Sequence, residues 1–299
     1  MKLGCSRRSF LGSSLVAFAG ASRAQTNLLG VAPAQDTNVY VCPMDPDVRS
    51  NTPGVCPRCG MKLASGLPDQ VEYHMDLDVA PRPLKPGAPS RLSFFVHDPW
   101  KGRQVTKFQV VHEKLFHMFI VSQDLKVFVH DHPVFQPDGS FTYDYSFPKP
   151  GMYRILGDFY PDGATPQLIA KTVFVSGAAG SAEPPVLPRD YSPKDTANMN
   201  VSLRTDPLQP IAGIKTQMYF DLKPADGIEK YIGAWGHMLA ASDDLVDLIH
   251  THPFIADGGP QVEFNVTFPR VKTYRVWVQF QRLGVVNTAQ FDVPVEELK

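Results

Sequence analysis

Six of the nine histidines lie in a pattern that occurs twice in the 299-residue sequence. The pattern is one histidine followed at a fixed spacing by His-x-His, and it comprises His117, His130 and His132 in the first copy and His237, His250 and His252 in the second. Neutral imidazoles bind Cu(II) and zinc, and three of them hold such an ion with a fourth position left for water or a thioether. A lone His-x-His is more simply a packed strand end, but its repetition at identical spacing favours metal coordination.

Each triplet is expected in one β-hairpin. The strands of the first hairpin are predicted over residues 116–121 and 126–132, around a loop at 122–125. A symmetric hairpin then pairs residues whose numbers sum to 247, so that His130 lies opposite His117, with His132 on the same face. The second copy has the same arrangement, with His250 opposite His237. The sequence therefore predicts one cluster of three neutral imidazoles per copy, at the end of an apolar inner face.

Other residues near these hairpins are assigned to packing. Met118 and Met238 fall on the opposite face and are expected in the core, although a β-bulge would bring them into the sites as secondary candidates. Asp158 aligns with Gln279 in the second copy, so it is not predicted to be a ligand. Three histidines have no counterpart in the second copy and are expected to be ordinary surface or core residues: His74, His97 and His112.

A second set of candidate ligands lies near the N-terminus. Cys56-x-x-Cys59 followed by glycine is a knuckle in which both sulfur atoms can point at one ion, and Cys42 precedes it in a second Cys-Pro turn. Thiolate and thioether ligands select Cu(I), zinc or similar soft metals. A disulfide would leave one of these three cysteines over.

Residues 40–63 resemble the short heavy-metal-binding domain attached to copper and silver efflux adaptor proteins and to copper-transporting P-type ATPases. The positions that match are Cys42, Pro43, Met44, Pro46, Val48, Pro53, Gly54, Cys56, Cys59, Gly60, Met61 and Leu63. The family has histidine where this chain has Asp45, so the resemblance implies a site of three cysteines with Asp45, or with Met44 or Met61. A zinc-stapled knuckle that only holds the N-terminus together is the alternative.

The first 24 residues have the features of an export signal. Residues 6–11, Ser-Arg-Arg-Ser-Phe-Leu, resemble the bacterial twin-arginine translocation signal, and a short apolar stretch and a small-x-small cleavage site at 22–24 follow. The apolar stretch is shorter than the roughly 20 residues that a membrane span needs, and no later segment is apolar enough. We therefore expect a periplasmic protein whose mature chain does not insert into the membrane.

The rest of the chain consists of one unit that occurs twice, at residues 71–176 and 197–295. Each copy has about seven short runs of β-branched and aromatic residues separated by turn signals, which is typical of an immunoglobulin-like sandwich. The predicted fold is all-β, with two tandem immunoglobulin-like β-sandwiches preceded by a small Cys-rich metal-binding knuckle. The predicted boundaries are 1–24 for the signal, 25–38 for a linker, 39–66 for the Cys module, 67–176 for the first sandwich, 177–194 for a second linker and 195–299 for the second sandwich.

Composition and motifs argue against several classes of function. A formal net charge of −1 and dispersed basic residues give no drive toward nucleic acid. Phosphate-loop, Gly-x-Ser-x-Gly and His-Glu-x-x-His motifs do not occur in the sequence. The sequence predicts an exported metal-binding protein that works in heavy-metal resistance or trafficking. Cu(I) is expected at the cysteines and Cu(II) or zinc at the histidines. The expected partner is an efflux or trafficking protein. The alternatives are a hydrolase or copper oxidase with a three-histidine site, and a structural pair of sandwiches with a zinc knuckle.

Overall fold

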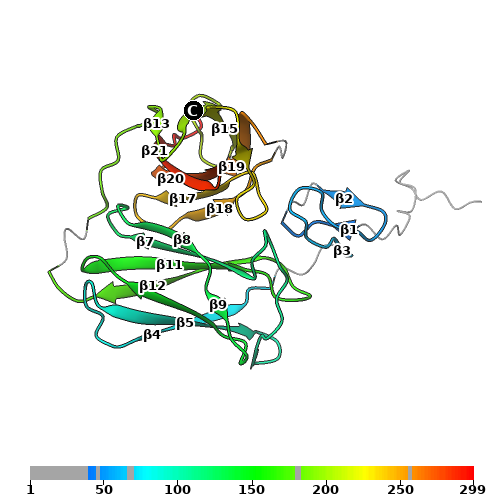
Figure 1. The fold of residues 1–299 in the computed structure, drawn as a ribbon, viewed down its shortest axis with the longest axis vertical. Coiled ribbons are helices and arrows are strands. Elements are labelled where there is room, and N and C mark those ends of the chain that lie inside the picture. The colour runs from blue at the N-terminus through cyan, green and yellow to red at the C-terminus, as the bar shows by residue number, and fades with distance from the viewer. Residues whose placement is uncertain (1–39, 45–47, 66–70, 179–182, 255–257) are drawn as a thin grey trace, which may run out of the picture. The chain divides into compact units, whose positions relative to one another are not determined.

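The computed structural model of the protein describes residues 40–44, 48–65, 71–178, 183–254 and 258–299 (Figure 1). Over these residues the chain forms strands and no helix, which confirms the predicted all-β fold. The described residues accordingly contain no helix that is long and apolar enough to cross a membrane. The expected export signal, the first linker and Asp45 lie outside the described residues.

The Cys-rich knuckle is a three-stranded sheet of two-residue strands. Its order is β2 (Arg49–Ser50), β1 (Tyr40–Val41) and β3 (Ala64–Ser65). The Cys-x-x-Cys turn is closed by backbone hydrogen bonds from Gly60 N to Cys56 O (2.8 Å) and from Cys56 N to Met61 O (2.7 Å). Gly60 has a φ of 76°, a backbone conformation that favours glycine, and so the turn needs glycine at this position.

The first β-sandwich consists of two sheets around an apolar core. One sheet has the order β4 (His74–Ala80), β5 (Pro89–Asp98), β10 (Phe141–Ser146) and β9 (Val134–Phe135), with β6 (Arg103–Gln104) paired to β5. The other has the order β12 (Gln167–Val175), β11 (Gly151–Phe159), β7 (Phe116–Ser122) and β8 (Phe128–Asp131). Every second residue of β5 is buried, because side chains alternate between the two faces of a strand, and Phe94 and Met118 lie in the resulting core.

The second β-sandwich repeats this plan. One sheet has the order β13 (Lys194–Asp195), β14 (Asn200–Asp206), β15 (Lys215–Lys223) and β19 (Gln261–Thr267). The other has the order β16 (Ile228–Glu229), β20 (Thr273–Arg282), β17 (His237–Ser242) and β18 (Leu248–Thr251), with β21 (Val285–Pro294) paired to β20. Part of the expected second linker packs on this sandwich: Asp190 N donates to Asp292 O (3.0 Å) and Tyr191 lies against the core.

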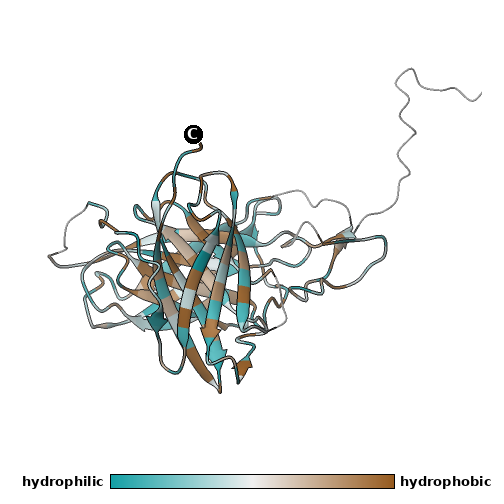
Figure 2. Cartoon of the chain, turned by 90° about the horizontal axis from the view of Figure 1, so that it is seen from above, coloured by the Kyte–Doolittle hydropathy of each residue, from teal (hydrophilic) through white to brown (hydrophobic). Residues whose placement is uncertain are grey.

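The two sandwiches pack against each other through the sheets that contain β7 and β17 (Figure 1). Every residue of β7 and β17 is buried, whereas a strand with one wet face alternates. One face of each strand enters the core of its own sandwich, and the other enters a shared apolar cluster of Phe119, Val121, Leu125, Leu156, Leu239, Ala241, Leu245 and Trp277. Figure 2 shows brown hydrophobic residues alternating with teal hydrophilic ones along strands that face the viewer. Phe128 stacks on Trp277 across the interface, with ring centroids 4.8 Å apart.

The hairpin register differs from the predicted one by two residues. The observed pairs are His130 with Phe119 and His250 with Leu239. The prediction that these histidines lie opposite His117 and His237 is therefore wrong. Because side chains alternate with a period of two, a shift of two residues keeps every side chain on the face where it was predicted to lie.

The reason for the shift is the geometry of the loop. The hairpin closes between Ser122 N and Val127 O (3.1 Å), so the loop begins one residue later than predicted. Leu125 turns the chain with a φ of 57°, and Leu245 does the same in the second hairpin with a φ of 55°. Both leucine side chains are buried in the shared interface cluster. Tertiary packing therefore stabilises leucine in a left-handed conformation, which counting along the sequence does not foresee.

Candidate metal centres

Seven histidines from both sandwiches converge at their interface. They are the six predicted residues His117, His130, His132, His237, His250 and His252, together with His112. In the first sandwich, His117 Nδ1 lies 3.3 Å from His130 Nε2 and 3.1 Å from His132 Nε2. Across the interface, the rings of His130 and His237 are 5.3 Å apart. The predicted triplet of His237, His250 and His252 comes together. The two triplets are not separate, however, because His237 also groups with His117 and His130 of the other sandwich.

His237 joins the two halves of this histidine cluster. The ligand atoms of His117, His130 and His237 lie within 4.8 Å of one another, and so do those of His237, His250 and His252. In the second half, His252 Nε2 lies 3.1 Å from His237 Nδ1. A tetrahedral ion bound at about 2.0 Å from each nitrogen holds those nitrogens about 3.3 Å apart. The observed spacings therefore fit an ion the size of zinc or copper.

Backbone carbonyls hold His117 and His237 in one tautomer. His117 Nε2 lies 3.0 Å from Val111 O, and His237 Nε2 lies 2.9 Å from Tyr231 O. Because a carbonyl only accepts, each Nε2 donates and each Nδ1 keeps its lone pair toward the cluster. The two carbonyls belong to equivalent tight turns whose central residues have positive φ.

The hairpin residues His130 and His250 are held from the opposite sandwich. His130 Nδ1 donates to Gln279 Oε1 in β20 (2.7 Å), and His250 Nδ1 donates to Asp158 Oδ2 in β11 (2.5 Å). These contacts leave the Nε2 lone pairs facing the cluster. Asp158 and Gln279 occupy equivalent positions in their own sheets, so the two sandwiches exchange hydrogen bonds across the interface.

Asp158 and Gln279 were not predicted to belong to the site, because their residue types differ between the copies. Their alignment in the repeat was the signal in the sequence that could have indicated equivalent roles for the two residues. Each lies on the strand beside a cluster histidine, opposite His117 or His237. Their partners are nevertheless in the other sandwich, and the sequence does not show how the sandwiches dock.

Burial keeps five of the clustered imidazoles neutral. Desolvation, followed by the neighbouring His250, lowers the pKa of His117 to about 4. Burial, followed by His117, lowers the pKa of His132 to about 3. The pKa values of His130, His237 and His252 also lie well below the usual value, with burial as the largest cause. At neutral pH these rings therefore offer lone pairs to a metal ion.

His112, which has no counterpart in the second copy, also lies in the cluster. Its ring centroid is 3.8 Å from that of His252 and 5.6 Å from that of His237. Its φ of 46° is a conformation that costs a non-glycine residue about 1–3 kcal/mol. Ile232 has the same backbone conformation in the second copy, with a φ of 48°. The turn is therefore common to both sandwiches, and the imidazole is what the first sandwich adds.

The two secondary methionine candidates and the remaining histidines lie outside the histidine cluster. Met118 and Met238 are fully buried in the cores of their own sandwiches, so neither secondary candidate reaches the cluster and the β-bulge does not occur. His74 and His97 lie on paired strands of the first sandwich, where their Nε2 atoms are 2.8 and 3.3 Å from the Asp76 carboxylate. The His74 side chain is 62% exposed, and we assign this pair to the surface.

The three cysteines of the knuckle form the second candidate centre. The Sγ atoms of Cys42, Cys56 and Cys59 lie within 4.8 Å of one another, with 3.5 Å between those of Cys42 and Cys59. All three are buried thiols. Burial raises the pKa of the Cys56 thiol. The buried thioether of Met61 and the partly buried Met44 pack on the same cluster. Among the described residues, this thiol centre therefore offers a sulfur-rich environment for a soft ion.

The thiol centre adjoins the histidine cluster. The side chain of Val111 packs on the cysteines, and the carbonyl of the same residue accepts the hydrogen bond from His117. The guanidinium of Arg58, inside the Cys-x-x-Cys turn, lies 4.3 Å from the ring centroid of Phe254. Phe254 follows His252 by two positions. The knuckle thus contacts loops of both sandwiches next to cluster histidines.

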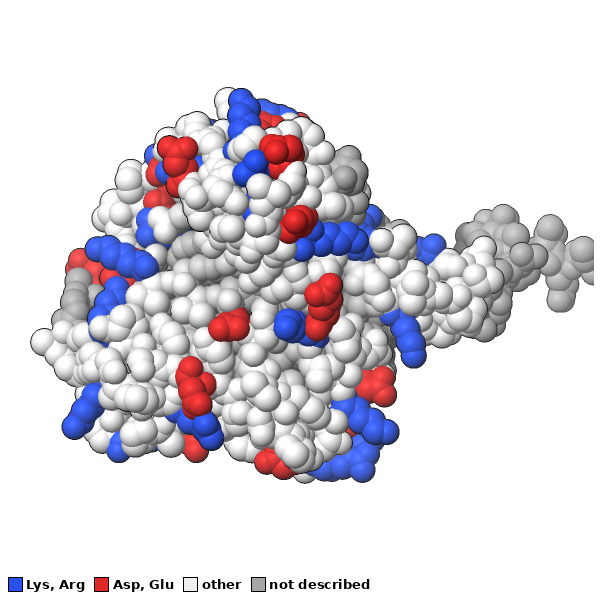
Figure 3. Space-filling view, in the orientation of Figure 1, with Lys and Arg blue, Asp and Glu red and all other residues white. Residues whose placement is uncertain are grey.

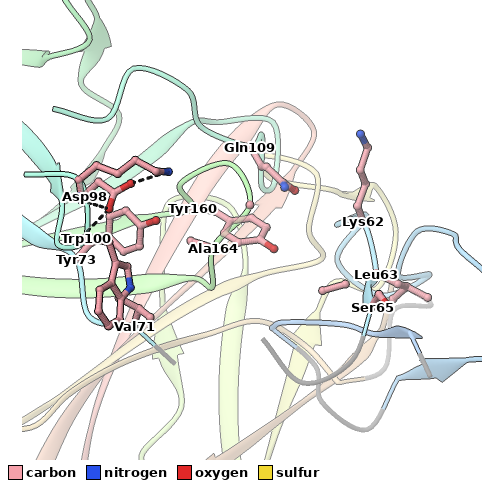
Figure 4. Close-up of a pocket in the computed structure, with 13 residues that line it drawn as sticks. Lys62, Leu63, Ser65, Val71, Tyr73, Asp98, Trp100, Gln109, Tyr160 and Ala164 are labelled. Atoms are coloured by element: carbon pink, nitrogen blue, oxygen red, sulfur yellow. Dashed lines mark hydrogen bonds and ion pairs between the residues drawn. The ribbon is translucent and has the colours of Figure 1, made fainter. Parts of the chain in front are cut away.

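Two cavities border the knuckle. One of about 590 Å³ lies between the knuckle residues Lys62 and Leu63 and the sandwich residues Trp100 and Tyr160, and neither cysteine nor histidine lines it (Figure 4). Another of about 560 Å³ is lined by Met44, Asp158 and His250. This second cavity gives solvent a route to the edge of the histidine cluster.

Charged side chains are dispersed on the face of the molecule drawn in Figure 3. Basic and acidic groups are interspersed there. Some charged groups of the described residues form exposed pairs, such as Arg91 with Asp144 (2.8 Å). A continuous basic groove that tracks a phosphate backbone is not formed on this face. The buried clusters of histidine and cysteine are therefore the features on which we base the function.

Solved structures resemble the chain at low sequence identity. The Escherichia coli adhesin FdeC is 12% identical, with a TM-score of 0.24, and the match covers 78% of this chain and 67% of that chain. A segment of two fibronectin type-III domains from chicken tenascin is 12% identical, with a TM-score of 0.22 and 74% and 98% of the two chains covered. Salmonella alpha-2-macroglobulin is 12% identical, with a TM-score of 0.24. The match covers 78% of this chain and 15% of that chain, so this chain spans only a small part of that protein. We draw no functional argument from these matches.

Sequence families match three parts of the chain. A comparison with curated proteins found no match. Residues 39–64 match the heavy metal binding domain, which confirms the resemblance seen in the Cys module. Residues 69–176 and 194–297 each match the family described as a domain of unknown function (DUF8832), and together they make up more than half of the chain. The protein therefore belongs to the DUF8832 family, with two copies of its domain behind a heavy metal binding domain.

Proposed function

We propose that this protein is an exported copper-binding protein that works in heavy-metal resistance or trafficking. The thiol centre would hold Cu(I), because sulfur ligands select soft ions. The histidine cluster would hold Cu(II) or zinc, for which imidazole nitrogen is the suitable ligand. The match of residues 39–64 to the heavy metal binding domain supports metal ions as the ligands. Zinc at the thiol centre is the alternative assignment.

One observation supports the proposal most strongly: imidazole lone pairs converge in a buried space. Outer hydrogen bonds place the protons of His117, His130, His237 and His250 on the nitrogens that face away from the cluster. The inward nitrogens of His117 and His130 are only 3.3 Å apart. Facing lone pairs repel each other, and a bound cation removes this repulsion. A histidine cluster that serves packing alone has no need of this arrangement.

Hydrogen bonds within the chain satisfy only part of this cluster. His132 Nε2 and His252 Nε2 each lie 3.1 Å from a neighbouring Nδ1 and can donate to it. His250 Nε2 is buried and has no hydrogen-bond partner among the described residues. An unsatisfied buried polar atom costs about 1–3 kcal/mol, and a metal bond at this nitrogen would offset that cost.

The first 24 residues support export through the twin-arginine pathway. The same signal leads us to propose the periplasm as the location, with an efflux or trafficking protein of the envelope as the partner that exchanges the ion. Fractionation of the native host would test the location. Recovery of the mature chain in the cytoplasm would contradict it.

Elemental analysis of untagged protein from its native host tests metal binding and identity together. We expect copper in the wild-type protein and loss of the histidine-bound ion in the double variant His117→Ala with His237→Ala, because these residues contribute to both halves of the cluster. The matched control is His74→Ala with His97→Ala, which removes two neighbouring surface histidines and should leave the metal content unchanged. Equal metal content in both double variants would contradict a metal site at the interface, and zinc in place of copper would change the assigned metal.

A further inference from the structure

We propose that the histidine cluster has two unequal halves and that a divalent cation is bound first by His237, His250 and His252, with Asp158 as the positioning carboxylate. This inference rests on the proposed function, since it concerns how the same cluster binds its ion. Because His237 then belongs to the first ion, the other half is taken as the three histidines of the first sandwich hairpin, His117, His130 and His132. This half would bind an ion more weakly.

The ligands of the two halves have nearly the same geometry. His252 Nε2 lies 3.1 Å from His237 Nδ1, and His132 Nε2 lies 3.1 Å from His117 Nδ1. Equivalent backbone carbonyls hold the two strand histidines in the same tautomer. The ligand atoms of His237, His250 and His252 also lie within 4.8 Å of one another. A further difference between the halves lies behind the ligands.

The residues behind the ligands differ in charge. His250 Nδ1 donates to the Asp158 carboxylate, whereas His130 Nδ1 donates to the neutral amide oxygen of Gln279. The amide nitrogen of Gln279 donates to Thr288 Oγ1 (3.0 Å), which holds the oxygen toward His130. A carboxylate makes the attached imidazole a stronger donor to a metal and fixes its orientation. Asp158 also adds a negative charge beside the cluster, which favours a divalent over a monovalent cation.

The half that contains Asp158 also holds a buried nitrogen, His250 Nε2, that has no hydrogen-bond partner among the described residues. The His250 side chain is 1% exposed. The corresponding atom of the other half, His130 Nε2, faces the lone pair of His117 Nδ1 at 3.3 Å. Both halves therefore hold nitrogens that gain from an ion, and one of the halves carries a carboxylate as well.

Access from solvent favours the same half. The cavity of about 560 Å³ is lined by both Asp158 and His250. Met44 of the knuckle lines it as well, so a thioether lies along the approach to the half that contains Asp158. An ion that enters by this cavity meets the carboxylate and His250 first.

Cobalt(II) is a suitable probe for the mature full-length protein, because thiolate complexes of Co(II) absorb strongly in the near ultraviolet and all-imidazole complexes do not. Binding at the two centres can therefore be measured separately in one titration. We expect Asp158→Asn, which keeps the shape of the side chain, to weaken Co(II) binding at the histidines about 10- to 100-fold. The matched control is Asp76→Asn, which removes a carboxylate from two surface histidines and should have no effect at the cluster.

An exchange of the two residues distinguishes positioning from a loss of folding. In the wild type, His252→Ala should weaken the first Co(II) ion at least about 100-fold and His132→Ala less than about 10-fold. In the background Asp158→Asn with Gln279→Glu, this dependence should reverse, because the carboxylate then lies behind His130. Equal effects of His132→Ala and His252→Ala in the wild type, or no reversal after the exchange, would overturn this inference and leave the proposed function intact. Absence of Co(II) at the histidines of the wild type would overturn both.

Discussion

The thiol centre and the histidine cluster are assembled by different means. The cysteines belong to one short module, and a glycine-containing turn brings two of them together. The histidines belong to two sandwiches, and hydrogen bonds between residues 92 and 149 positions apart orient His250 and His130. A local centre forms as soon as its turn forms. The interface centre requires that both sandwiches fold and dock, so metal binding there is coupled to docking.

The two centres also differ in the ions they suit. The thiol centre surrounds its space with sulfur from cysteine and methionine, whereas the methionines next to the strand histidines point into the sandwich cores. Sulfur ligands, which suit soft ions, and nitrogen ligands, which suit borderline ions, are therefore separated within one molecule. The following predictions test whether the thiol centre and the histidine cluster bind metal independently.

Loss of thiols should have the largest effect. In the double variant Cys42→Ser with Cys59→Ser, we expect soft-metal binding at the knuckle to fall at least about 100-fold, because one thiol remains where three converged. The histidine cluster should keep its ion, since none of its ligands comes from the knuckle. Titration with Co(II), read at the thiolate absorption and at the longer-wavelength bands, measures both. Parallel loss of both signals would show that the centres are not independent.

Removal of the interface aromatic should have the next largest effect. Trp277 is 3% exposed and stacks on Phe128 from the other sandwich, so Trp277→Ala should cost about 3–5 kcal/mol of the free energy of unfolding and docking. We expect weaker Co(II) binding at the histidines and unchanged binding at the thiols. Trp100→Ala is the matched control, because Trp100 is 80% exposed. An unchanged histidine affinity in Trp277→Ala would separate metal binding from docking.

Acid and alkali should act on different regions of the metal-free protein. The folded protein protonates His117 only near pH 4, whereas the unfolded chain does so near 6.5. The unfolded state therefore binds more protons between these values, and the free energy of unfolding should fall as the pH drops from about 6.5 to 4, by up to about 3 kcal/mol for this ring. The raised pKa of Cys56 has the opposite sign, so stability of the knuckle should fall as the pH rises above 9.

Denaturant titrations at several pH values, with chelator present, measure this dependence. His117→Gln should remove part of the acid effect and leave the alkaline effect unchanged. A free energy of unfolding that stays constant between pH 7 and 5 would contradict the burial of neutral imidazoles at the interface.

A core methionine should show the smallest effect. Met118 is fully buried in the first sandwich and faces away from the cluster, so Met118→Leu should cost less than about 1.5 kcal/mol of stability. Metal content should not change, because the thioether is not a ligand. Elemental analysis alongside thermal unfolding checks both points. Loss of metal in this variant would indicate that the Met118 thioether is a ligand.

Much of the fold was predictable because its signals are local. Alternating apolar residues and turn residues indicated strands such as β5 and β11, and the duplication indicated two sandwiches of one type. The register of the hairpins was not predictable by counting. The left-handed conformation of Leu125 depends on the burial of its side chain against the other sandwich, and this burial moved the loop by one residue.

The sequence by itself determined the ligand types, their repeated spacing, the face of the strand on which they lie and the resemblance of the Cys module to a metal-binding domain. These features follow from residue chemistry and from the period of a strand. Only the tertiary structure decided that the two histidine triplets form one cluster, that His112 joins it, and that Asp158 and Gln279 orient ligands across the interface. The physical reason is that docking depends on the complementarity of two assembled apolar surfaces, which are formed by side chains far apart in the chain.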